Sequence, residues 1–146
     1  MIYYGKRGAP DTTEVYAGVS REMPLNPAFT LYYDVDEGDG ALALLSVSQD
    51  LPVGAGVSLS LAAAASYNMN HKVMGTLADG EPFAGFYHGE LGLAVALPAG
   101  RRLAIAPRIL YSFPLTDQAR EAMQEASFDG HTTSLLSGGV SFVIGF

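Results

Sequence analysis

Apolar side chains alternate with small or polar ones at every second position along most of this 146-residue chain. Successive side chains of a β-strand point to opposite faces of a sheet, so a period of two predicts strands with two different faces. The alanine run at 62–65 favours a helix by propensity, but the Ser-Leu alternation before it favours a strand. We expect a short stub at 2–4 and seven strands, at 13–20, 29–36, 43–48, 57–68, 87–97, 103–113 and 136–146.

The connections between these segments fall into two groups. Short segments built of Pro, Gly and Asn, typical of tight turns, lie at 22–27, 51–55 and 98–101. Longer or more acidic loops lie at 5–12, 37–40, 69–83 and 114–130. In an up-and-down meander, successive connections lie at opposite ends of the sheet, so the turns share one end and the loops share the other. This asymmetry is typical of outer-membrane β-barrels, whose long loops face outward from the cell.

The composition of the less apolar face separates two barrel architectures. A soluble barrel exposes its polar face to water, whereas a membrane barrel turns its apolar face to lipid and its polar face to the lumen. Here the less apolar face is mainly Ser, Ala and Gly, and only 16% of all residues are charged, which is too few for a water-exposed exterior. We therefore expect a transmembrane antiparallel up-and-down β-barrel of about eight strands, forming a single domain over 1–146.

Aromatic residues support the membrane interpretation independently. Four tyrosines lie on the apolar face near the strand ends that meet the long loops, and a phenylalanine lies one step beyond the last. An amphipathic ring at that depth keeps its body in lipid and its hydroxyl among the headgroups. The predicted girdle consists of Tyr33, Tyr67, Tyr87, Tyr111 and Phe113.

The last strand carries apolar or aromatic residues at alternate positions and ends on a phenylalanine. The residues are Val140, Phe142, Ile144 and Phe146. This pattern resembles the C-terminal strand signature of bacterial outer-membrane β-barrel proteins. The resemblance implies location in the bacterial outer membrane, contact with the lipid bilayer and recognition by the barrel-assembly machinery. It does not single out a subfamily.

The first strand is incomplete by this interpretation. A membrane-spanning β-strand needs about 9–11 residues, and the stub at 2–4 is shorter. The chain therefore has eight strands as given, or it is the C-terminal part of a larger barrel whose first strands are missing. The N-terminus has no apolar run behind a basic start, so we expect any signal peptide to have been removed.

Charged and polar residues on the less apolar face are candidates for the lumen. Glu90 and Arg108 lie on neighbouring predicted strands and are expected to form a diagonal ion pair, or alternatively a selectivity constriction. Asp34 and Asp36 add negative charge near the outer mouth, which favours a weak preference for cations. Two further lumen candidates are Tyr32 and His88.

Several kinds of chemistry are not expected. His88 and Ser112 are predicted to face each other, but no oxyanion site accompanies them, so we expect no enzyme. We expect no cofactor and no metal site, and we expect His71 and His131 to be solvated. The net charge of −7 excludes a basic surface for nucleic acid. The acidic stretch 34–40 departs from the EF-hand pattern and is predicted to be a hairpin loop, with loose divalent-ion binding as the alternative.

The sequence thus predicts a porin-like protein that passes small solutes or ions passively. A structural outer-membrane barrel without a pore is one alternative, and a soluble lipocalin-like barrel with a small apolar ligand is another. Residues with helical spacing at 115–126 predict a short helix over the barrel mouth, capped by Thr116 or Asp117.

Overall fold

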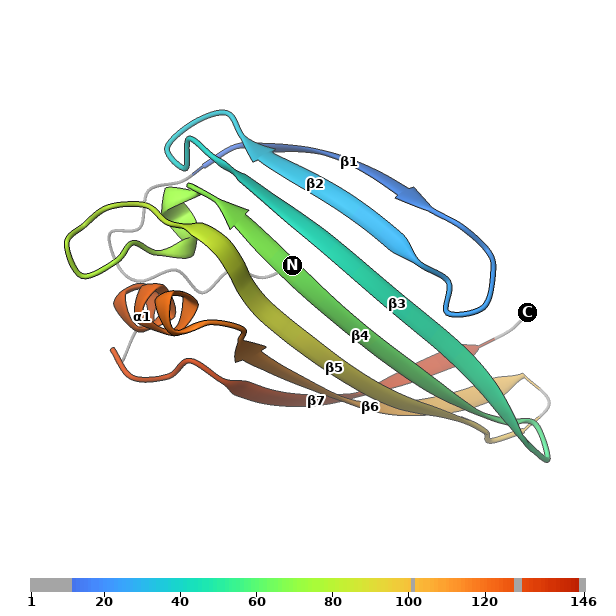
Figure 1. Cartoon of the computed structure of the whole chain (residues 1–146). Coiled ribbons are helices and arrows are strands. Elements are labelled where there is room, and N and C mark those ends of the chain that lie inside the picture. The colour runs from blue at the N-terminus through green and yellow to red at the C-terminus, as the bar shows by residue number, and fades with distance from the viewer. Residues whose placement is uncertain (1–11, 101, 128–129, 145–146) are drawn as a thin grey trace.

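The computed structural model describes residues 12–100, 102–127 and 130–144. Seven antiparallel strands form one sheet in chain order, which confirms the all-β, up-and-down prediction. The strands are β1 (Glu14–Ser20), β2 (Ala28–Asp34), β3 (Ala41–Gly54), β4 (Val57–Met69), β5 (Ala84–Pro98), β6 (Leu103–Pro114) and β7 (Leu135–Ile144). Figure 1 shows a long, twisted sheet with the tight turns at one end and the loops and helices at the other.

The sheet is not closed into a barrel. Within the described residues β1 and β7 are its two edges and do not pair with each other. The predicted stub at 2–4 and the predicted assembly-signal residue Phe146 lie outside the described residues. The structure therefore shows the open sheet, and the predicted eight-stranded closure is not part of it.

The two faces of the sheet keep the alternation of the sequence. One row of paired residues runs Leu61–Leu93–Ile109, and these three side chains are exposed. The adjacent row runs Ala62–Gly92–Leu110 on the opposite side. We call the first side the apolar face; its exposed members include Phe29, Leu31, Tyr33, Leu45, Leu61, Tyr67, Leu91, Leu93, Ile109, Tyr111, Val140, Phe142 and Ile144. The other side is the small-residue face.

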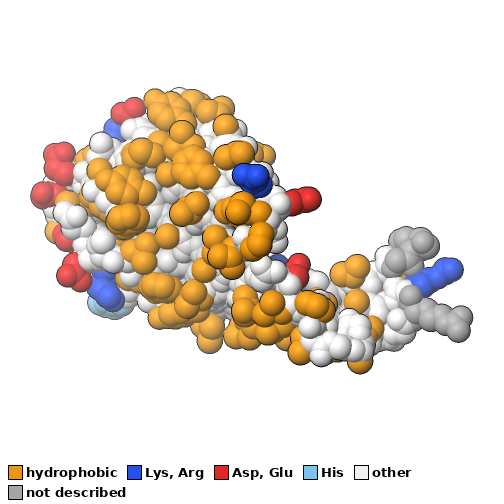
Figure 2. Space-filling view, turned by 45° about the vertical axis from the view of Figure 1, so that its right-hand side comes forward, with side chains coloured by type: hydrophobic (Ala, Val, Ile, Leu, Met, Phe, Trp, Pro, Cys, Tyr) orange, Lys and Arg blue, Asp and Glu red, His pale blue; other side chains and the backbone are white. Residues whose placement is uncertain are grey.

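Figure 2 shows hydrophobic side chains spread over much of the visible surface, with few charged groups among them. In a protein surrounded by water, exposed apolar patches of this extent are rare. The apolar face therefore has the character of a contact surface.

A small hydrophobic core lies at the loop end. Its buried members are Leu42, Phe83, Tyr87, Ala119 and Ala122, and we call this cluster the loop-end core. The last two belong to α1 (Asp117–Ala126), so the predicted helix is confirmed. A 3₁₀ helix, η1 (Lys72–Met74), precedes β5 and contributes Met74 to the edge of the core. Within the described residues, no helix has both the length and the apolar character needed to cross a membrane.

Segment 72–78 and α1 touch closely. A Cβ at Gly75, whose φ is 102°, would overlap the backbone carbonyl of Ala122. The amide of Ala78 donates to Oε1 of Glu121 at 2.7 Å, and the hydroxyl of Tyr87 donates to the carbonyl of Met74 at 2.7 Å. Glycine is therefore required at position 75, both for the close approach and for its positive φ.

Replacing Thr116 with alanine is expected to lower the free energy of unfolding by about 1–2 kcal/mol. The Thr116 hydroxyl accepts from the amide of Ala119 at 3.1 Å and donates to the carbonyl of Phe86 at 3.0 Å. The substitution removes both hydrogen bonds at the start of α1. Chemical denaturation of the refolded protein measures the loss. The exposed Thr13→Ala is the control, and an equal effect of both changes would contradict the capping role.

A β-bulge in β5 changes which aromatic residues reach the apolar face. Ser66 of β4 faces two residues of β5, Tyr87 and His88, because the flanking pairs are Ala65–Gly89 and Tyr67–Phe86. A bulge of this kind adds one residue to one strand and shifts the alternation beyond it.

The prediction that Tyr87 belongs to the aromatic girdle is therefore wrong. Tyr87 is only 8% exposed and lies in the loop-end core, whereas Phe86 is 57% exposed on the apolar face. Phe86 meets Tyr67 edge to face, with ring centroids 5.4 Å apart. Tyr33, Tyr67 and Tyr111 are exposed, as predicted. Phe113 is half-buried and stacks on Tyr111 with centroids 5.4 Å apart.

Candidate functional site

The small-residue face is hollow toward the turn end. A hollow of about 490 Å³ is lined by Ser60, Ala62, Gly92, Ala94, Arg108 and Ser137, among others. The small side chains leave this space open, and Arg108 is the charged residue in its wall. Leu93, Ile109 and Leu110 also line it, so the wall of the hollow is largely apolar apart from Arg108 and the two serines.

The structure does not bring Glu90 and Arg108 together. Glu90 pairs with Ser112, and Arg108 pairs with Ala94, four residues further along β5. At about 3.3 Å per residue, the two positions are roughly 13 Å apart along the sheet. The predicted ion pair is wrong because Pro98 pairs with Ala104. The predicted turn would pair Pro98 with Arg102, so the observed register of β6 differs from the prediction by two residues.

Glu90 instead faces His88 on its own strand. Its Oε1 lies 3.7 Å from Nε2 of His88, and Nδ1 of His88 lies 2.7 Å from the hydroxyl of Ser66. The Ser66 hydroxyl also accepts from the backbone amide of His88 at 3.1 Å, and Ser66 is 1% exposed. These hydrogen bonds between Ser66 and His88 stabilise the β-bulge of β5. The predicted opposition of His88 and Ser112 is wrong, because His88 pairs with Pro114.

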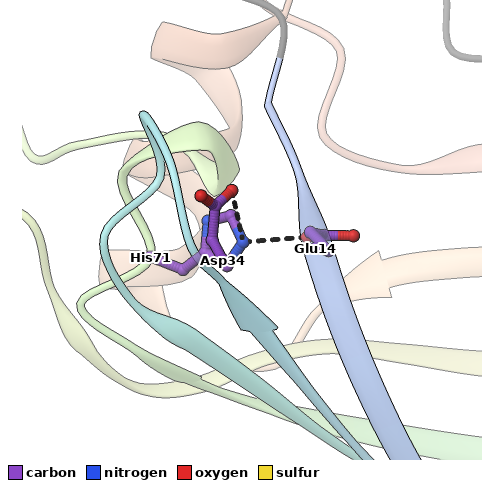
Figure 3. A group of neighbouring side chains, drawn as sticks. All are labelled: Glu14, Asp34 and His71. Carbon is purple, nitrogen blue, oxygen red and sulfur yellow. Dashed lines mark hydrogen bonds and ion pairs between the residues drawn. The ribbon is translucent and has the colours of Figure 1, made fainter.

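A second polar cluster lies at the loop end of the first two strands. Figure 3 shows Glu14 from the start of β1, Asp34 from the end of β2 and His71 from the loop before η1 converging on one point. Nε2 of His71 lies 2.9 Å from Oε1 of Glu14 and 3.7 Å from Oδ2 of Asp34. His71 is fully buried, so the prediction that it is solvated is wrong.

The carboxylate of Asp34 is buried and strongly hydrogen bonded. Oδ2 accepts from the Thr12 hydroxyl, and Oδ1 accepts from the amides of Asp36 at 2.8 Å and Gly38 at 3.0 Å. Burial alone would raise the pKa of this carboxyl, but these hydrogen bonds and the nearby His71 hold the pKa below its ordinary value. Asp34 is therefore charged at neutral pH and fixed in position.

Two glycines make room for the cluster. A Cβ at Gly38 would overlap the Asp34 carboxylate and the His71 ring, and a Cβ at Gly40 would overlap the backbone of His71. The segment between β2 and β3 is a tight hairpin loop, as predicted, and Asp36 is exposed in it. The loop backbone therefore wraps closely around the buried imidazole.

The remaining candidates lie where the alternation places them. Tyr32 is on the small-residue face, half-buried, with its ring centroid 5.8 Å from that of Tyr16. Val140, Phe142 and Ile144 are exposed on the apolar face of β7. The residue that sequence reasoning missed is His71. The sequence held one indication of this cluster: Glu14 and Asp34 both lie on the small-residue face, where they pair directly.

Comparison with known proteins adds no family. The sequence matches no protein-family model and no curated protein.

Proposed function

We propose that this chain forms the wall of an integral outer-membrane β-barrel that passes small solutes or ions. The observation that carries the proposal is the exposed apolar face, backed by a small-residue face that leaves a hollow. Lipid is the neighbour that makes an apolar exterior favourable, and water is the neighbour that suits a lining of Ser, Ala and Gly. The C-terminal strand pattern supports the bacterial outer membrane as the location.

Strand length supports the same proposal. The four central strands have 14, 13, 15 and 12 residues, which exceeds the 9–11 or so that a tilted strand needs to cross a bilayer. The girdle residues Tyr33, Tyr67, Phe86 and Tyr111 cluster toward the loop end of the apolar face. We take the membrane-spanning part as the strands between this girdle and the tight turns.

The loop-end core favours a second candidate, a barrel without an open pore. Phe83 and Tyr87 are buried on the small-residue side at the loop end, and α1 packs against them. A passage along this face would have to run past these side chains. The alternative of a soluble lipocalin-like barrel is less favourable, because it would leave the apolar face in water.

Conductance in a planar bilayer separates the candidates. The refolded chain is expected to insert and to give discrete, weakly cation-selective steps. Insertion without steps would favour the barrel without a pore. A folded state in plain buffer that does not insert would contradict the membrane proposal.

Charge substitutions on the small-residue face are expected to change ion selectivity. Arg108→Ala removes a positive charge from the wall of the hollow and should raise the preference for cations. Glu90→Ala removes a negative charge from a neighbouring pocket on the same face and should lower it. The reversal potential in a salt gradient measures both shifts. Arg102→Ala, near the turn, is the control and should shift the potential less. Equal reversal potentials in all four proteins would contradict a passage along this face.

A further inference from the structure

We infer that Glu14, Asp34 and His71 bind one divalent transition-metal ion, with Zn²⁺ as the best match. This inference does not depend on the proposed transport function. The three side chains each offer one ligand atom, and these atoms all lie within 4.8 Å of one another. They come from β1, β2 and the loop before η1, so a bound ion would join three separate segments.

The distances within the cluster are near those of a metal site. Zinc bonds to imidazole nitrogen and carboxylate oxygen are about 2.0–2.2 Å long, so neighbouring ligand atoms of a tetrahedral site lie about 3.3–3.5 Å apart. Nε2 of His71 lies 2.9 Å from the Glu14 oxygen and 3.7 Å from the Asp34 oxygen. Shifts of less than an ångström in these two separations would accommodate the ion.

The charge of the cluster also favours a cation. Glu14 and Asp34 pair directly across two strands, an arrangement in which like charges repel. Among the residues that the structure describes, no Lys or Arg forms an ion pair with either carboxylate, and Lys72 is paired with Asp39. A divalent ion would balance the charge of the two carboxylates.

The ligands are held in place by their surroundings. The His71 amide donates to Oδ1 of Asn68, while Asp34 accepts the three hydrogen bonds described above. Nδ1 of His71 is buried, and no described group is hydrogen bonded to it. Nε2 of His71 is hydrogen bonded to Oε1 of Glu14 at 2.9 Å, and because a carboxylate oxygen only accepts, Nε2 carries the proton of that bond. Zinc would take the place of this proton, since a nitrogen that binds metal must be deprotonated. Ligands oriented by a second layer of contacts bind metal more tightly.

The donor set indicates which ion binds and how it enters. One imidazole nitrogen with two carboxylate oxygens suits zinc, whereas Ca²⁺ and Mg²⁺ need six or more ligands, mostly oxygens. The side chain of Glu14 is 30% exposed, while those of Asp34 and His71 are fully buried. The ion would therefore enter beside Glu14, and water from that side would complete its coordination.

Calorimetry on the untagged, chelator-treated full chain in detergent micelles tests the site. ZnCl₂ is expected to bind saturably with one ion per chain, and CaCl₂ at the same concentrations is expected not to bind. Glu14→Gln should weaken zinc binding at least tenfold, since even the loss of a supporting contact costs about 10–100-fold. Glu37→Gln, in the exposed loop at the same end of the sheet, is the matched control and should bind as the parent does.

Thermal unfolding with and without zinc checks that the folded state binds the ion. Zinc should raise the Tm of the parent and of Glu37→Gln, and it should raise that of Glu14→Gln less at the same zinc concentration. His71→Asn should also lose the response; if it fails to fold, Glu14→Gln still decides the question. Absence of saturable binding, or equal affinity in the parent and Glu14→Gln, would overturn the inference. Neither readout requires conductance, so failure here is distinct from failure of the transport proposal.

Discussion

Replacing Leu93 with arginine is expected to destabilise the folded protein in lipid by about 2–4 kcal/mol, the cost of a charged side chain at the middle of a lipid-facing strand. Leu93 lies on the apolar face between Leu61 and Ile109, and all three side chains are exposed. In the proposed membrane orientation, an arginine there would place its guanidinium in the hydrocarbon region. The free energy of unfolding in lipid vesicles, measured by denaturant titration, gives the loss.

The control for this substitution lies on the opposite face. Ala62 lines the hollow and pairs with Gly92, the residue next to Leu93 in β5. Ala62→Arg puts the same charge into the proposed aqueous lumen, so its cost in lipid should be much smaller. Equal losses at the two positions would show that the faces do not meet different solvents. A larger loss for Ala62→Arg would indicate that the small-residue face is the one against lipid.

The Phe83→Ala substitution is expected to cost about 3–5 kcal/mol, because it leaves a cavity in the loop-end core. Phe83 is 3% exposed, and its ring centroid lies 5.9 Å from that of Tyr87. Among the residues that the structure describes, five buried hydrophobic side chains make up this core, so few neighbours can fill the space. Denaturant unfolding of the refolded protein measures the loss.

Phe86→Ala provides the comparison for Phe83→Ala. Phe86 belongs to the same segment but is 57% exposed on the apolar face, so its truncation should cost far less in lipid. The same pair separates the two functional candidates. If a passage runs beside the loop-end core, Phe83→Ala should raise the conductance and Phe86→Ala should not. Similar stability losses for both would contradict the core described here.

The sequence predicts most of the fold because alternation is a local signal. Each strand segment shows its two faces within a few residues, and α1 shows both its spacing and its cap at Thr116. The register between strands is less predictable. A β-bulge opposite Ser66 inserts one residue without disturbing composition, and it exchanges the roles of Phe86 and Tyr87. The turn after Pro98 likewise shifts the register of Glu90 and Arg108, and the composition of the turn does not reveal the shift.

The cluster of Glu14, Asp34 and His71 could not be predicted from local sequence patterns, for a different reason. His71 is flanked by Asn70 and Lys72, which makes it look like an ordinary solvated loop residue. Its burial depends on the neighbouring hairpin, where Gly38 and Gly40 allow the backbone to approach the ring. Asp34, the member of the cluster nearest to His71 in sequence, lies at the end of β2, whereas His71 lies in the loop before η1. Only the folded arrangement of three segments brings the donor atoms together.

The contact between Gly75 and α1 has a mechanical consequence. The backbone of Gly75 lies against the backbone of Ala122 in α1. The hydrogen bond from the amide of Ala78 to Glu121 joins segment 72–78 to α1 a second time. Tyr87 ties the first segment to β5 through Met74. Moving α1 away from the sheet would therefore break the Ala78–Glu121 hydrogen bond, or else pull segment 72–78 along and break the Tyr87–Met74 bond. The loop end is thus braced through a segment that lies outside the strands themselves.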